Sequence, residues 1–159
     1  MSRLAPILQG FFTDRLSRQR QASPHTVAAY RDSIRLLVAY AANATGKQPV
    51  DLDVTDLDAA LIVAFGVGLL PDAVRLLGGD QPARSARLVL TGPAGGDWTL
   101  PLGSGDPAST PAATVTMDAV EFCYLLGNRR DPGSVPHTVE GDPELAATLL
   151  RAAATLGCD

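Results

Sequence analysis

The sequence predicts an α+β protein made of two dissimilar halves, a small helical bundle followed by a half in which strands and helices alternate. Apolar residues recur at helical spacing through residues 1–65. Beyond residue 65, Gly and Pro interrupt the chain and short alternating segments typical of strands begin. Charge divides in a similar way, because residues 1–35 carry six arginines against two aspartates, whereas residues 63–159 carry six arginines against eleven acids.

Three helices are expected in the first half. Residues 3–20 form an amphipathic helix with arginines on its polar side. Ser23 is placed to cap a second helix, with Pro24 at its first position and Gly46 at its left-handed end. Thr55 is placed to cap a third helix that ends at Phe65, with two aspartates in its first turn.

The second half predicts the order β-β-β-α-β-α. The stretch 66–71 is expected to break the preceding helix, with one short turn of helix at 72–77. Strands are then expected at 86–91, 98–102 and 114–117, followed by a helix at 118–126, a strand at 138–140 and a helix at 142–156. Such an order favours helices packed on one face of a sheet.

Composition predicts a cytoplasmic protein without a membrane partner. No apolar run is expected to approach the ~20 residues that span a bilayer, and no signal peptide is evident. Cys123 is interpreted as a small core residue and Cys158 as a tail thiol. The two histidines, His25 and His137, stand alone, so neither a metal site nor a cofactor is expected.

The first half resembles a known DNA-binding domain. The run FFTDRLSRQRQASPHTVAAYRDSIRLLVAYA, followed by DLDVTDLDAALIVAF, is similar to the N-terminal core-binding (SAM-like) domain of tyrosine recombinases and phage integrases. Thr26, Tyr30, Ile34 and Leu37 occupy the places of that family's Thr-x-x-x-Tyr helix. The resemblance covers residues 1–65 and implies a helical clamp that binds duplex DNA.

Carried over residue by residue, the resemblance implies a DNA-binding set at the start of the second helix and along the basic segment. Helix N-termini favour phosphates, and arginine and lysine supply the charge that duplex DNA attracts. The implied residues are Arg18, Arg20, His25, Thr26, Arg31, Arg35 and Lys47. Simpler interpretations stay open: Ser23 and Thr26 as capping residues, Tyr30 as a core residue, and the arginines as a solvated helix face.

Residues 66–159 resemble a second family. RLVLTGPAGGDWTLPLG, with the later segments LLGNRR and VEGD, is similar to the C-terminal domain of mycothiol-dependent maleylpyruvate isomerases, a sterol-carrier-protein-like fold. This likeness implies a module that binds a small thiol or apolar ligand, or that forms a homodimer. The implied ligand-binding residues are Trp98, Phe122, Arg129 and Arg130. The two arginines also suit a helix end on electrostatic grounds alone.

Neither resemblance brings a catalytic set with it. The recombinase Arg…His-x-x-Arg…Tyr constellation and the isomerase metal ligands are both missing from this sequence, so no enzymatic activity and no catalytic residue are expected. Three hypotheses follow: a non-catalytic DNA-binding protein or remnant of a recombinase, a small-ligand-binding or dimerisation module, and a product of gene rearrangement.

Overall fold

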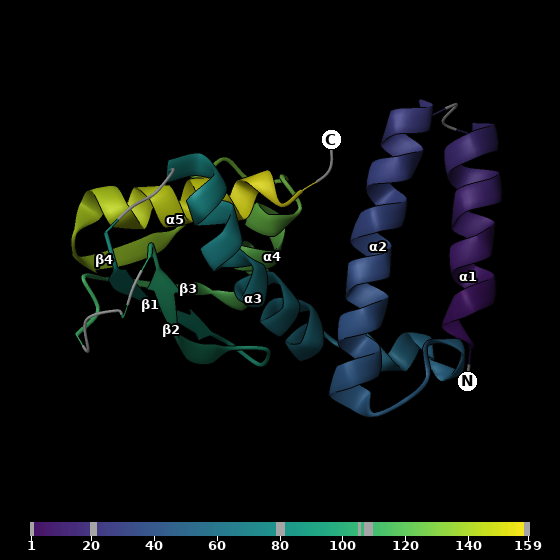
Figure 1. Ribbon diagram of the computed structural model, residues 1–159, viewed down its shortest axis with the longest axis horizontal. Helices are drawn as coiled ribbons and strands as arrows, with labels where there is room; N and C mark the ends of the chain where they lie inside the picture. The colour runs from purple at the N-terminus through teal and green to yellow at the C-terminus, as the bar shows by residue number, and fades with distance from the viewer. Residues whose placement is uncertain (1, 20–21, 79–81, 105, 107–109, 158–159) are drawn as a thin grey trace. The chain divides into compact units, whose positions relative to one another are not determined.

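The computed structural model describes residues 2–19, 22–78, 82–104, 106 and 110–157, without the side chains of residues 17–19 (Figure 1). The chain divides into two units, Met1–Ile62 and Val63–Gly157. The predicted junction at Phe65 lies close to this division, inside a helix that runs through both numbers. Each unit has its own hydrophobic core.

The first unit consists of two long helical segments joined to short 3-10 turns. Helix α1 (Leu4–Gly10) continues as the π-helix η1 (Phe11–Gln19), so the predicted span 3–20 is helical but changes its hydrogen bonding midway. Helix α2 (Pro24–Thr45) is followed by η2 (Pro49–Asp51) and η3 (Val54–Asp56). The buried centre of this unit is Leu4, Ala41, Ala42 and Leu52.

Both ends of α2 form as predicted. The Ser23 hydroxyl accepts the Thr26 backbone N–H at 3.1 Å, with Pro24 at the first helical position. At the other end, Gly46 has a φ of 68°, a left-handed conformation that glycine adopts without steric cost. The edge-to-face contact of Tyr30 with Phe11, 5.8 Å between ring centroids, supports the interpretation of Tyr30 as a packing residue.

The third helix differs from the prediction at both ends. Thr55 lies in the 3-10 turn η3, and helix α3 (Ala59–Gly78) begins after Asp58, whose side chain accepts the Leu61 N–H at 2.8 Å. The predicted break at 66–71 is wrong, because α3 continues through Gly66 and Pro71 to Gly78. Burial of five apolar α3 residues in the second unit's core outweighs the low helix propensity of Gly and Pro.

Helix α3 also corrects the expectation about apolar runs. It is 20 residues long and contains an 18-residue stretch with a mean hydropathy of 1.9, which makes it the one helix in the described part of the chain long and apolar enough to cross a membrane. A single such helix is weak evidence for a membrane span. Its apolar side chains have another use, since Val63, Val67, Leu70 and Val74 lie in the core of the second unit.

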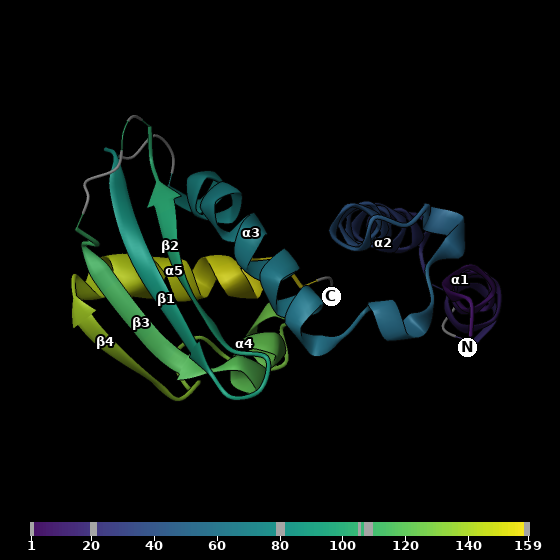
Figure 2. The same ribbon diagram turned by 90° about the horizontal axis from the view of Figure 1, so that it is seen from below.

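The second unit is a four-stranded mixed sheet with helices on one face (Figure 2). After α3 come β1 (Arg84–Thr91), β2 (Gly96–Leu102), β3 (Ala113–Asp118), α4 (Ala119–Leu126), β4 (His137–Gly141) and α5 (Pro143–Thr155). The predicted β-β-β-α-β-α order is confirmed. The strands lie in the order β2-β1-β3-β4, with β1 and β3 parallel and the outer pairs antiparallel.

Alternation along the strands decides which face of the sheet is covered. Leu88 of β1 pairs with Val115 of β3 in register, and both are buried under the helices. Their neighbours Arg87 and Thr114 lie on the opposite, more polar face. Asp118 and Asp142 cap α4 and α5 by accepting backbone N–H groups.

Candidate nucleic-acid interface

The N-terminal end of α2 is the best-formed element of the predicted DNA-binding set. The hydroxyls of Ser23 and Thr26 lie 2.9 Å apart and serve the cap, so both are already used locally. His25 is exposed in the first turn. Of the backbone amides in this turn, only the His25 N–H is left for an anion, because Pro24 has none and those of Thr26 and Val27 donate to Ser23. The helix dipole adds to the attraction. The arrangement therefore suits a phosphate, with capping as the established role of Ser23 and Thr26.

The two arginines of α2 differ in their availability. Arg35 is paired with Asp32 at 2.8 Å, and both side chains are about two-thirds exposed or more, at 72% and 67%. Arg31 is exposed and has no ion-pair partner among the residues that the structure describes. Because an exposed pair of this kind is weak, a phosphate competes for Arg35 at modest cost, while Arg31 is free to bind one directly.

Lys47 lies at the other end of α2 from His25. The helix has 22 residues, which is about 33 Å at the standard rise, so the two residues cannot contact the same phosphate. The Lys47 ammonium donates to both oxygens of the Asp56 carboxylate, at 2.7 and 2.8 Å. That bond, with a further one from the Asp53 backbone N–H, lowers the pKa of Asp56. Lys47 therefore holds the loop after α2 in place.

Two predicted residues lie beyond what the structure describes. Arg20 is outside the described residues, and the side chain of Arg18 is also outside them. One further cation was left out of the predicted set: Arg15 of η1 is exposed, with no ion-pair partner in the described part of the chain. The position of Arg15 on the polar side of the first helical segment could have predicted that it binds DNA.

Arg3 is a cation with a structural role. Its guanidinium donates to the Val50 carbonyl at 2.9 Å and to the Asp51 carboxylate at 2.6 Å, and the Asp51 hydrogen bond raises the pKa of Arg3. The chain next to it pairs with residues 52–54, since the Leu4 N–H donates to the Leu52 carbonyl at 2.9 Å.

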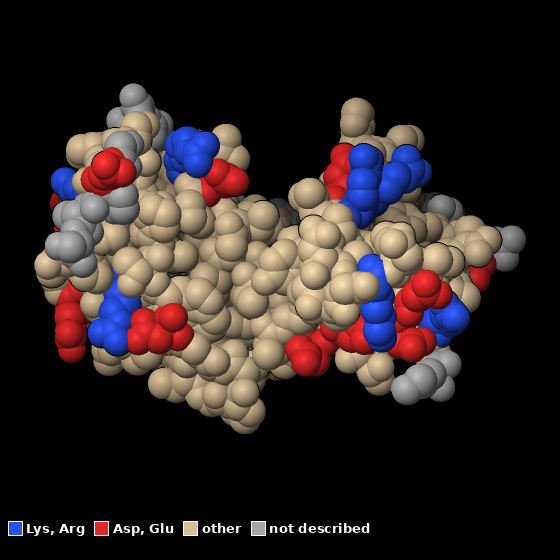
Figure 3. Space-filling view, turned by 60° about the horizontal axis from the view of Figure 1, so that its bottom comes forward, with Lys and Arg blue, Asp and Glu red and all other residues tan. Residues whose placement is uncertain are grey.

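On the face seen in Figure 3, basic side chains lie beside acidic ones in both units and form no continuous basic band.

The four residues implied as ligand-binding in the second unit are not brought into a cavity. Phe122 is 1% exposed and belongs to the core, and Trp98 packs against that core from its edge. Arg130 lies 3.3 Å from the Glu121 carboxylate and 5.9 Å from the centre of the Tyr124 ring. Arg129 is exposed at the end of α4. None of the four lines either of the two cavities described below.

Within the described residues, no group of three His, Cys, Asp or Glu side chains could hold a metal ion. Cys123 packs against the core of the second unit, and burial raises the pKa of its thiol. A raised thiol pKa leaves little thiolate at neutral pH, which agrees with its interpretation as a core residue. Cys158 lies outside the described residues.

Comparison with known proteins shows that residues 10–64 are similar to a recombinase domain. Residues 10–64 match the family described as phage integrase, N-terminal SAM-like domain, and this integrase domain binds DNA in general. The chain is 52% identical over 86 residues to a Sinorhizobium fredii protein named integrase/recombinase y4rC. The matched region covers 54% of this chain and 25% of that protein. A second protein of that organism, named integrase/recombinase y4rD, is 47% identical over 62 residues, covering 39% of this chain and 22% of its own.

The extent of these matches sets limits on what they imply. The chain spans about a quarter of the length of the two curated relatives. A match of 86 residues must reach residue 86 or beyond, so the likeness to y4rC passes the predicted junction at Phe65. No solved structure matches the chain. The family and the two relatives do not bear on the resemblance of residues 66–159 to maleylpyruvate isomerases, which stays a prediction.

Proposed function

We propose that this chain is a DNA-binding protein that carries the DNA-clamping domain of a tyrosine recombinase and does not cleave DNA by itself. The observation that supports the proposal most is the match of residues 10–64 to the integrase SAM-like domain. Helix α2 agrees with it, because it carries the exposed His25 and also Arg31, which has no ion-pair partner among the described residues. The same role places the protein in the cytoplasm, where bacterial DNA is accessible.

The absence of cleavage follows from residues that the chain does not contain. Neither histidine is followed by an arginine three residues later, because Ala28 and Glu140 stand at those positions. Tyr30 is engaged with Phe11, and Tyr124 lies on the exposed side of α4. A tyrosine nucleophile requires several cations around the phosphate to stabilise the developing charge. Strand cleavage would therefore need residues that this sequence does not contain.

Binding is expected to be weak and strongly dependent on salt. Each phosphate that a lysine or arginine neutralises contributes about −0.9 to the slope of log affinity against log salt. Arg15 and Arg31 alone give a slope of about −2, and contributions from Arg18 and Arg20 would bring it to about −4. The measured slope therefore counts how many of these arginines contact the duplex.

The test is a fluorescence anisotropy titration of a labelled duplex over a range of salt concentrations. Arg31→Gln should weaken binding and reduce the salt slope by about 0.9. Arg129→Gln, which removes an exposed arginine from the second unit, is the matched control and should change neither. Absence of binding at 25 mM salt (about four times lower than a standard 0.1 M buffer) would reject the proposal, as would equal effects of the two substitutions.

The second candidate function is a small-ligand-binding or dimerisation module, and one observation favours the ligand. The second unit contains a cavity of about 580 Å³, which is within the range of roughly 300–1,000 Å³ found for ligand pockets. Dimerisation has no comparable support and is checked by sedimentation of the full chain at two concentrations. The cavity, by contrast, is lined by both apolar and charged side chains, and these indicate which class of ligand it could bind.

A further inference from the structure

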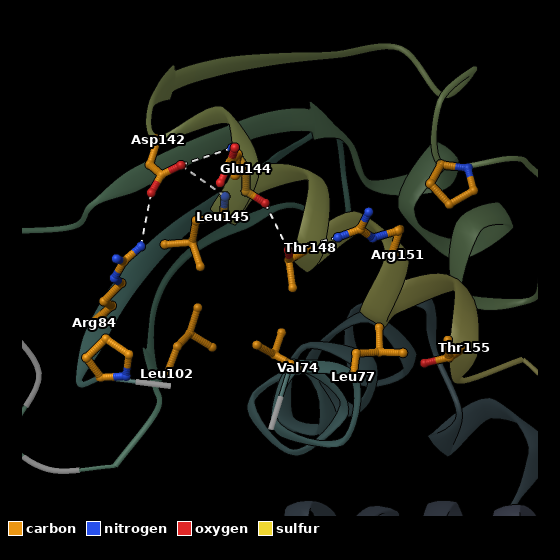
Figure 4. Close-up of a pocket in the computed structure, with 13 residues that line it drawn as sticks. Val74, Leu77, Arg84, Leu102, Asp142, Glu144, Leu145, Thr148, Arg151 and Thr155 are labelled. Carbon is orange, nitrogen blue, oxygen red and sulfur yellow. Dashed lines mark hydrogen bonds and ion pairs between the residues drawn. The ribbon is translucent and has the colours of Figure 1, made fainter. Parts of the chain in front are cut away.

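The larger cavity of the second unit lies where four segments far apart in sequence meet (Figure 4). Val74 and Leu77 come from the last turns of α3, Arg84 from the start of β1, and Leu102 from the end of β2. Helix α5 forms the remaining wall, from its cap Asp142 to Thr155. The cavity belongs entirely to this unit and is separate from the residues proposed to bind DNA.

Part of the apolar wall of this cavity is exposed, so a ligand can cover it. Val74, Leu102 and Leu145 are nearly buried, but Leu77 is 48% exposed on the cavity side of the unit. Each Å² of apolar surface that a ligand removes from water contributes roughly 25 cal/mol. An occupant with an apolar body is therefore favoured over a small inorganic ion.

On one side of the cavity the charges are already satisfied. Arg84 donates to one oxygen of the Asp142 carboxylate at 3.1 Å. The other oxygen accepts the backbone N–H groups of Glu144 and Leu145, at 2.9 and 3.1 Å. Asp142 thus caps α5 and pairs with Arg84, so neither side chain carries an uncompensated charge for a ligand.

On the other side lies an uncompensated cation. The Arg151 guanidinium donates to the Thr148 hydroxyl at 3.1 Å, and that hydroxyl donates to the Glu144 carbonyl at 2.9 Å. Arg151 has no carboxylate partner within the described ranges. Figure 4 shows its side chain directed toward Thr148, across the cavity from the Arg84–Asp142 pair. Glu144 is two turns away on α5, about 10 Å along the axis, which leaves room for an anion.

A second cavity makes Arg151 accessible from both sides. This cavity has a volume of about 400 Å³ and is lined by His137, Val139 and Leu150 together with Pro132 and Arg151. Pro132 and Arg151 line the larger cavity as well. A group bound at Arg151 therefore has an apolar recess on either side of it.

We propose that Arg151 is the anion-binding group of a small-molecule site, and that the ligand is an organic anion with an apolar body that occupies the larger cavity. The carboxylate or sulfonate of such a ligand accepts hydrogen bonds from the guanidinium. Its apolar part covers Leu77 and its neighbours. Because the site lies in the second unit, the proposal of a ligand site is tested independently of the proposal of DNA binding.

The test uses two fluorescent probes that differ by one sulfonate group, with the full chain as the protein. 8-Anilinonaphthalene-1-sulfonate carries the anion, and N-phenyl-1-naphthylamine is its neutral analogue. Arg151→Gln should weaken binding of the sulfonate about tenfold or more, since hydrogen bonds to charged groups contribute roughly 1.5–3 kcal/mol, and should leave the neutral probe unchanged. Arg129→Gln should change neither.

Two further results complete the test. Glu144→Gln removes a carboxylate that lines the same cavity and has no ion pair among the described residues, and it should strengthen binding of the sulfonate only. Circular dichroism of each variant in the near ultraviolet, where Trp98 absorbs, verifies that the second unit stays folded. The proposal is overturned if the wild-type chain binds neither probe, or if Arg151→Gln weakens both probes equally, because an equal loss would mean that Arg151 only maintains the shape of the cavity.

Discussion

Lys47 and Asp56 connect the end of α2 to the turn that precedes α3, with the lysine ammonium 2.7 and 2.8 Å from the two carboxylate oxygens. The resemblance to the recombinase domain implies that Lys47 binds DNA. In the structure Lys47 forms an ion pair with Asp56, whose side chain is only 15% exposed. A partly buried carboxylate that loses its cation is costly, so this pair is expected to stabilise the first unit.

Replacing Lys47 with Met should therefore lower the stability of the first unit in a manner that depends on pH. The pKa of Asp56 is lowered in the folded state, so its stabilising effect is present above its ordinary value near 3.9 and is lost as pH falls through the folded value. Thermal melts followed by far-ultraviolet circular dichroism should show a lower midpoint for the variant at pH 7 and a smaller difference at pH 3.

Trp98 supplies the control for that measurement. It is the one tryptophan of the chain and lies in the second unit. Its fluorescence transition should be the same in wild type and in Lys47→Met, because the change concerns only the first unit. A shift of the Trp98 transition, or an equal midpoint difference at both pH values, would contradict the assigned role of the pair.

Replacing Asp32 with Asn should increase DNA affinity. Asp32 holds Arg35 at 2.8 Å and lies beside Arg31, so the substitution frees one arginine and removes one repulsive charge. The salt slope should become steeper by about 0.9 if Arg35 then contacts one more phosphate. The measurement is the anisotropy titration described above for the labelled duplex.

A matched substitution exists in the second unit. Asp72 and Arg75 form the same kind of pair in α3, three residues apart at 2.7 Å and similarly exposed. Asp72→Asn changes the net charge by the same amount without touching α2. If it raises DNA affinity as much as Asp32→Asn, the effect is one of overall charge and α2 has no special role.

Local signals in the sequence predicted the helix caps well. Ser23 and Gly46 both act where the pattern placed them, because a cap depends on neighbours within a few residues. The same local reasoning failed at Gly66 and Pro71. There the deciding factor is burial of α3 against strands far along the chain, which no short pattern contains.

The site was harder to predict for the same reason. Lys47 and Asp56 are nine residues apart across a turn, and their pairing depends on how η3 folds. The cavity at Arg151 joins the end of α3 to β1, β2 and α5, so it exists only in the tertiary structure. Phe122 was predicted to contribute to ligand binding, although its apolar side chain lies in the core.

Two glycines of the second unit should respond in opposite ways to replacement by alanine. Gly141 has a φ of 87°, and a Cβ there would lie 2.4 Å from the Ala112 carbonyl oxygen. That oxygen also accepts the Asp142 N–H at 2.9 Å. Gly141→Ala should cost about 1–3 kcal/mol from backbone strain alone, with the clash adding to it. Gly68 of α3 has open space around it, so Gly68→Ala should stabilise by about 0.5–1 kcal/mol.

Urea unfolding followed by Trp98 fluorescence measures both effects in the same unit. The midpoint should fall for Gly141→Ala and rise for Gly68→Ala, with the dependence on urea concentration unchanged. A fall for both variants would mean that α3 is not a regular helix at Gly68. No change at Gly141 would mean that β4 and α5 are joined differently.

Helix α4 offers the last prediction, a pair of aromatic side chains on opposite faces. Phe122 is 1% exposed, whereas Tyr124 is 47% exposed and contacts the Arg130 guanidinium. Phe122→Ala should destabilise the second unit by about 3–5 kcal/mol because it leaves a cavity in the core. Tyr124→Ala should cost no more than about 1 kcal/mol, the value of an exposed cation–π contact. Urea titrations of the two variants compare them directly.

The comparison also separates packing from ligand binding at Phe122. If Phe122 acts through the core, Phe122→Ala shifts the urea midpoint, but the molecules that remain folded bind the sulfonate probe with unchanged affinity, since Phe122 does not line the cavity at Arg151. If instead Phe122 contacts ligand, the affinity per folded molecule falls while the midpoint moves little. The first result is expected, because a side chain that is already enclosed by Leu125 and its neighbours in the core has no free surface for a ligand to cover.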